Sequence, residues 1–105
     1  MRRMLLILAG LSLVALPAAA RPDLAAGRRI AGKCAPCHAI GEKGASVNPK
    51  APPFRELSKK YPVDSLQESL AEGILTGHTG DMPQFKLTPA QIVDFLGYLR
   101  SIQVK

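Results

Sequence analysis

A chain of 105 residues has room for one small domain, so a multidomain architecture is excluded. Its net charge of +6 falls to +4 once the first twenty residues, which hold two of the fourteen basic side chains, are set aside. This charge is modest, and the chain has no tryptophan, two tyrosines and three phenylalanines. So few aromatic residues exclude a nucleic-acid interface built on aromatic stacking.

The first segment, residues 1–20, has the pattern of a cleaved secretory signal peptide. Two arginines precede an apolar run over residues 4–16, and a proline and three alanines ending at Ala20 follow it. The run is shorter than the roughly 20 residues that a membrane-spanning helix needs. We therefore expect cleavage after Ala20 and export to the periplasm of residues 21–105 as one domain without a membrane span. An uncleaved anchor is the alternative.

Residues 23–35 are predicted to form the first helix of the exported chain. Asp23 suits the N-cap position, and apolar residues recur after it at helical spacing. Gly27 lies on the apolar face of this helix. It is either a point where another helix approaches closely or a glycine that the helix simply tolerates.

This helix carries the run Cys34-Ala35-Pro36-Cys37-His38 at its end, which is the C-x-x-C-H pattern of covalent c-type haem attachment. Two thiols three positions apart fit one turn of helix and can add to the two vinyl groups of one porphyrin. The next residue, His38, would then supply the proximal nitrogen ligand of the iron. These are the only two cysteines, so no disulfide framework competes for them.

The rest of the chain is predicted to be loops and helices. Residues 39–61, rich in proline, glycine and lysine, read as a long loop that wraps the haem. Residues 63–72 read as a helix that Gly73 ends, and residues 89–102 as a helix that Thr88 opens with a capping box. No segment alternates with period two, so we expect an all-α fold of three to four helices with long loops around a covalent haem.

The second axial ligand is expected from the loop between the last two helices. Met82 is the only methionine outside residues 1–20, and it precedes a proline that fixes the backbone. Its thioether is a soft, neutral ligand that favours ferrous iron. His78 would instead give bis-histidine ligation and a lower potential, and an open iron face is the third possibility. We expect Met82 to be the ligand.

The order of these elements resembles that of a class I monohaem cytochrome c over essentially the whole exported chain. Ala51-Pro52-Pro53-Phe54 is similar to the family's Gly-Pro-x-Leu element, with alanine in place of the glycine. In that element the proline carbonyl accepts a hydrogen bond from the proximal histidine. The resemblance therefore implies that Pro52 orients His38.

The resemblance also implies how the protein is built and what it does. The terminal helices of the family cross, which would place Gly27 against Phe95 or Tyr98. One haem c would be attached covalently through Cys34 and Cys37. The implied function is a monomeric periplasmic electron carrier, not an enzyme, that serves a dehydrogenase or an oxidase.

Four lysines are expected near the haem edge: Lys33, Lys43, Lys50 and Lys86. They would steer the protein towards redox partners with acidic docking surfaces, or they are ordinary solvated surface.

Three other functions stay open at this point. The Cys34-Ala35-Pro36-Cys37 run resembles the active site of a thiol-disulfide oxidoreductase, although that site needs a βαβ setting. A zinc module would combine these thiols with histidines at spacings that suit tetrahedral zinc poorly. A haem with an open iron face would make the protein catalytic or a sensor.

Overall fold

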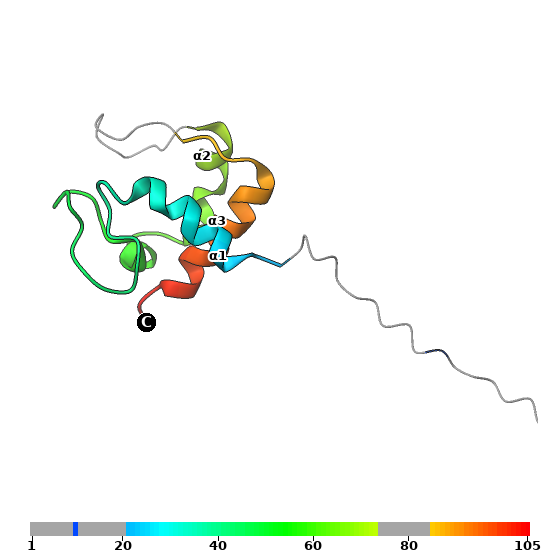
Figure 1. Ribbon diagram of the computed structural model, residues 1–105, viewed down its shortest axis with the longest axis horizontal. Coiled ribbons are helices and arrows are strands. Elements are labelled where there is room, and N and C mark those ends of the chain that lie inside the picture. Colours follow the sequence, from blue (N-terminus) through cyan, green and yellow to red (C-terminus); the bar gives the residue numbers. More distant parts are fainter. Residues whose placement is uncertain (1–9, 11–20, 74–84) are drawn as a thin grey trace, which may run out of the picture.

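The computed structural model describes residues 10, 21–73 and 85–105, and within these ranges the chain is helical without a strand (Figure 1). This confirms the predicted all-α class. In chain order the elements are α1 (Leu24–Ala31), the 3₁₀-helices η2 (Gly32–Cys34), η3 (Phe54–Lys59) and η4 (Val63–Leu66), and the helices α2 (Gln67–Glu72) and α3 (Pro89–Ile102).

The first predicted helix is confirmed, but its last turn is tighter than an α-helix. Asp23 caps α1, because its carboxylate accepts a hydrogen bond of 3.0 Å from the amide of Ala26. From Gly32 the chain continues as η2, and the amide of Ala35 bonds to the Gly32 carbonyl at 3.3 Å. Such i to i+3 bonds commonly tighten the end of a helix, and here they lead the chain into the cysteine motif.

The helices α1 and α3 pack directly against each other, and Gly27 is the point of closest approach (Figure 1). A Cβ atom on Gly27 would lie 2.1 Å from the Asp94 carbonyl oxygen and 2.7 Å from the Cβ atom of Tyr98. Of the two aromatic residues expected at this crossing, Tyr98 is the one in contact. Phe95 and Tyr98 are both buried in the hydrophobic core.

The prediction of a loop over residues 39–61 is wrong in its last third, where η3 forms. Phe54 and Leu57 are only 5% and 4% exposed, and they lie three positions apart. Side chains at this spacing lie above one another in a 3₁₀-helix, so one short turn buries both. Two apolar residues in a proline-rich stretch are too few to reveal this turn as a periodic pattern.

The two remaining predicted helices are confirmed. The second begins as η4 and continues as α2, and Gly73 ends it with a φ of 79°, a conformation that favours glycine. Thr88 and Gln91 form the predicted capping box of α3, with bonds of 3.0 and 3.3 Å. The segment before α3 is tied to α2, because the amide of Leu87 donates to the Leu70 carbonyl at 3.0 Å. These contacts bring α2 and α3 together around one apolar space.

Candidate haem-binding site

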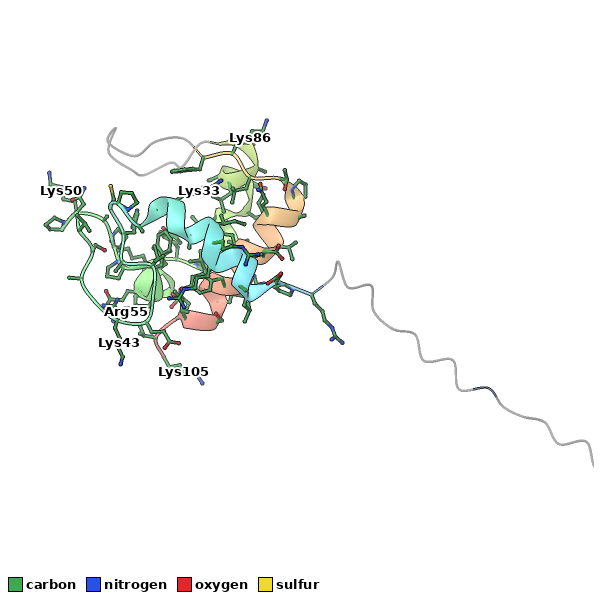
Figure 2. All side chains as sticks on the ribbon, viewed as in Figure 1. Lys33, Lys43, Lys50, Arg55, Lys86 and Lys105 are labelled. Atoms are coloured by element: carbon green, nitrogen blue, oxygen red, sulfur yellow. The ribbon has the colours of Figure 1, made fainter. Side chains whose placement is uncertain are left out.

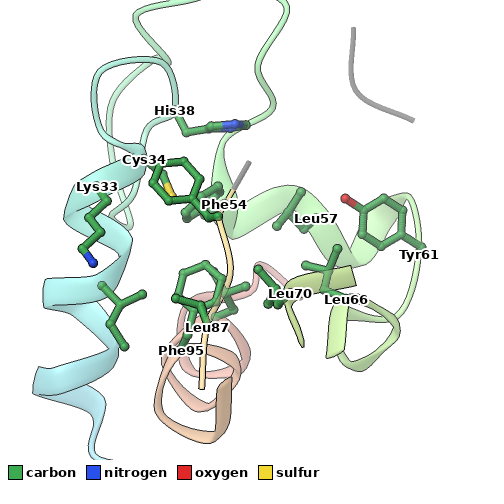
Figure 3. A pocket seen from close by; sticks show the side chains of 13 residues that line it. Lys33, Cys34, His38, Phe54, Leu57, Tyr61, Leu66, Leu70, Leu87 and Phe95 are labelled. Carbon is green, nitrogen blue, oxygen red and sulfur yellow. The ribbon is translucent and has the colours of Figure 1, made fainter. Parts of the chain in front are cut away.

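An apolar cavity of about 580 Å³, part of it open to solvent, lies between the end of α1, η3, α2 and α3 (Figure 3). Apolar side chains make up most of its walls, as is usual for small-molecule and cofactor sites. The lining residues are Ile30, Lys33, Cys34, His38, Phe54, Leu57, Tyr61, Leu66, Leu70, Phe85, Leu87, Phe95 and Leu99.

The cysteine motif forms one turn at the edge of this cavity. The amides of Cys37 and His38 both donate to the Cys34 carbonyl, at 3.1 and 2.9 Å. Cys34 and His38 line the cavity, whereas Cys37 is half-buried beside it and does not belong to the lining. The turn thus presents one thiol and one imidazole to the same apolar space (Figure 3).

The His38 ring is buried, with 7% of its surface exposed, and its orientation is fixed by a backbone carbonyl. Its Nδ1 atom lies 2.8 Å from the carbonyl oxygen of Pro52. Because a carbonyl can only accept, Nδ1 carries the proton and Nε2 carries the lone pair in the neutral ring. Of the two prolines in the Gly-Pro-x-Leu-like element, Pro52 is therefore the one that meets His38.

The Phe54 ring packs against the imidazole, and no pattern in the sequence predicts this contact. The two ring centroids are 4.8 Å apart, and the planes are inclined by 36°. Phe54 in turn meets Phe95 of α3 edge to face, with centroids 6.0 Å apart. The imidazole is thus held by a carbonyl at one nitrogen and by an aromatic ring at its side.

The segment that follows the motif is folded back by side-chain and backbone bonds. The amide of Ala39 donates to Ser46 Oγ at 3.0 Å, and the amide of Asn48 donates to the Cys37 carbonyl at 3.0 Å. The hydroxyl of Tyr98 on α3 donates to the Ile40 carbonyl at 2.6 Å. Tyr98 therefore packs against Gly27 and also holds the loop that follows His38.

The setting of the Cys34 thiol does not suit thiol-disulfide exchange. Burial raises the pKa of the Cys34 thiol to about 11; Lys33 lowers it by a smaller amount, and Cys37 raises it slightly. Thiol-disulfide oxidoreductases depend instead on a reactive thiolate with a lowered pKa. The setting is also helical throughout the described ranges, with no βαβ unit around the motif.

The residues present fit a haem. Two thiols on one turn, an imidazole fixed through Nδ1 and an apolar cavity are what covalent attachment and proximal ligation require. Among the described residues, no three His, Cys, Asp or Glu side chains are arranged to hold a metal ion. Met82 and His78, the two candidates for the second axial ligand, lie outside the described residues.

The four lysines expected near the haem edge are not grouped in the structure. Lys33 lines the cavity, and Lys86 lies between two residues that line it. Lys43 lines a separate groove between α1 and the end of α3, and Lys50 is exposed on the loop. Figure 2 shows Lys43 beside Lys105, at the other end of the view from Lys86.

A model of the cytochrome c family matches residues 24–103, and the chain therefore belongs to the cytochrome c family. The family binds haem c covalently, and its members are typically electron carriers and not enzymes. No curated protein and no solved structure gives a significant match. Within the described part of the chain, no helix is both long and apolar enough to cross a membrane.

Proposed function

We propose that the protein is a periplasmic electron carrier that cycles one covalently bound c-type haem between Fe(III) and Fe(II). The observation that carries this proposal is the C-x-x-C-H turn at the edge of an apolar cavity, with His38 fixed through Nδ1 by Pro52. The structure describes only residue 10 of the first twenty residues, and the sequence of this segment supports export with cleavage after Ala20.

Each residue of the site has a separate role in this proposal. Cys34 and Cys37 would hold the haem covalently, each through a thioether bond to one vinyl group. His38 would ligate the iron through Nε2, while the Pro52 carbonyl keeps the proton of the imidazole on Nδ1. The bound haem supplies reversible one-electron chemistry at its iron. The apolar lining keeps water away from most of that site.

A potentiometric titration of the purified protein, followed by haem absorbance, tests this function. A carrier gives one reversible one-electron transition, and its reduced form does not bind carbon monoxide readily because both axial positions are filled. Ready binding of carbon monoxide by the reduced wild-type protein would favour the catalytic or sensor alternative. A protein without haem absorbance would return the thiol-disulfide alternative to consideration.

Met82 is proposed as the second axial ligand, and Met82→Ala is expected to lower the reduction potential. Loss of the thioether removes a ligand that stabilises ferrous iron, and it opens one face of the iron to carbon monoxide or cyanide. The measurements are the potentiometric titration and a ligand titration of the variant, which should keep its haem through Cys34 and Cys37.

The matched control for this prediction is His78→Ala, from the same loop. It should leave the potential and the ligand affinity close to those of the wild-type protein. The assignment of Met82 is wrong if Met82→Ala behaves like wild type while His78→Ala opens the iron to carbon monoxide.

The proposed partner is a redox protein with an acidic docking surface, and Lys33 and Lys86 are the lysines best placed to meet it. Lys33 lines the cavity and Lys86 lies between two residues that line it, so a partner that approaches this face meets their charges first. We expect Lys33→Ala and Lys86→Ala each to slow electron transfer by about twofold at low salt, with the difference fading as screening shortens the Debye length to about 8 Å.

Lys43→Ala is the control, because it removes the same charge from the separate groove. Stopped-flow mixing with an acidic redox protein at several ionic strengths measures all three variants. Equal effects of the three substitutions would show that only the net charge matters and that no docking face is formed by Lys33 and Lys86.

A further inference from the structure

The side chain of Gln103 joins the end of α3 to both ends of η3. Its Nε2 atom donates to the carbonyls of Leu99, at 2.8 Å, and of Phe54, at 2.7 Å. Its Oε1 atom accepts a hydrogen bond of 2.8 Å from the amide of Ser58. One amide group therefore satisfies a terminal carbonyl of α3 and two backbone groups of η3, which lie 45 and 49 positions away in the sequence.

Phe54 connects these bonds to the proximal histidine. The Phe54 carbonyl is held by Gln103, and the Phe54 amide donates to the Ala39 carbonyl at 2.9 Å. The Phe54 ring lies against His38, and the carbonyl of Pro52, two positions earlier, accepts the hydrogen bond from His38 Nδ1. The position of the Pro52 carbonyl is thus set by a segment that is anchored to α3 at one end and to the residue after His38 at the other.

Gln103 is not the only link between the C-terminal segment and η3. The amide of Val104 donates to the Arg55 carbonyl at 2.9 Å, and Phe54 meets Phe95 in the core. Both contacts remain when the Gln103 side chain is removed. We therefore expect loss of this side chain to let η3 shift by a small amount without unfolding the domain.

We propose that Gln103 is a positioning residue that sets the hydrogen bond between the Pro52 carbonyl and His38 Nδ1, and through it the reduction potential of the haem. This inference rests on the proposed function, since it concerns His38 as the iron ligand. A strong bond at Nδ1 makes the imidazole a better donor to iron, which favours Fe(III). A weaker bond therefore raises the potential.

The test is potentiometry of the haem-loaded Gln103→Ala variant. We expect about a threefold rise in the ratio of ferrous to ferric protein at a fixed solution potential. This effect is smaller than the roughly tenfold or larger change in metal affinity or activity that direct loss of a hydrogen-bond partner of a ligand commonly causes. At about 59 mV per tenfold change for one electron, this is a shift of about 28 mV to higher potential. The haem-methyl shifts of the ferric protein in proton NMR should change too, because they report the orientation of the imidazole plane.

Ser101→Ala is the matched control at the same end of α3. The Ser101 hydroxyl donates to the Tyr98 carbonyl at 2.6 Å, so its bond stays within the helix. Removal of this hydroxyl should lower the stability of the fold by about as small an amount as Gln103→Ala does. It should leave the potential and the haem-methyl shifts unchanged. Gln103→Met is the second variant: it keeps a side chain of similar length without adding a charge, and it removes the bonds to the Leu99 and Phe54 carbonyls and to the Ser58 amide. Its potential should also rise.

The outcomes separate this inference from the function on which it rests. A wild-type protein with a reversible haem transition, together with Gln103 variants of unchanged potential and faster hydrogen exchange at Ser58, would overturn the positioning role and leave the electron carrier intact. If Gln103→Ala fails to fold, an unchanged potential in Gln103→Met has the same meaning. A wild-type protein without haem would overturn the proposed function itself.

Discussion

Gly27→Ala is expected to destabilise the folded protein by about 3 kcal/mol or more, at or above the upper end of typical overpacking costs. The added Cβ atom would lie 2.1 Å from the Asp94 carbonyl oxygen, a distance that real Cβ atoms essentially never show. The obstacle is backbone of α3, so no side-chain rotation relieves it, and α1 must move away from α3. Chemical denaturation followed by far-ultraviolet circular dichroism measures the loss.

Gly32→Ala is the control, because it makes the same substitution one turn beyond Gly27. No atom lies within 4 Å of the Cβ position at Gly32, so the helical preference of alanine should leave stability unchanged or raise it by up to about 1 kcal/mol. A stable Gly27→Ala variant with unchanged packing would show that α1 and α3 do not meet as described.

The double variant Cys34→Ser, Cys37→Ser is expected to lose covalent haem completely. A serine hydroxyl does not add to a vinyl group under the conditions of attachment, so nothing would bind the porphyrin to the chain except ligation and apolar contact. Acid–acetone extraction of the purified variant should move all haem absorbance into the organic phase. Cys34 is the only residue of the cavity lining that this variant changes, so the other apolar side chains around the haem stay the same.

The two single variants are the controls for the double variant. Each keeps one thioether, so each should retain haem with one vinyl group unsaturated, visible as a shifted pyridine haemochrome spectrum. Haem that resists extraction in the double variant would show that these thiols are not the points of attachment.

Local signals in the sequence predicted the parts of the fold that depend on neighbouring residues. Asp23 and the Thr88 capping box act within three positions, so their roles in α1 and α3 could be stated from the sequence alone. The cysteine motif is equally local, since its turn is closed by bonds to Cys34. The sequence allows Gly27 to be either a point of close helix approach or a tolerated glycine, and the contacts with Asp94 and Tyr98 show the close approach.

What the sequence did not reveal depends on contacts between distant residues. The Phe54 ring meets His38 across 16 positions, and Gln103 reaches Phe54 across 49, so no periodicity or spacing rule connects them. The 3₁₀-helix η3 is short and follows two prolines, which made the segment resemble a loop. Lys43 was grouped with the other lysines because charge alone says nothing of which face a residue occupies.

The intact mass of the exported wild-type protein after acid–acetone extraction tests the central claim most directly. The account predicts a single species with the mass of residues 21–105 plus one haem, since two thioether bonds survive extraction and cleavage follows Ala20. One number thus reports attachment, stoichiometry and processing together. A species with the mass of the polypeptide alone, with its haem in the organic phase or with none detected, would contradict the claim that this cytochrome c carries its haem covalently.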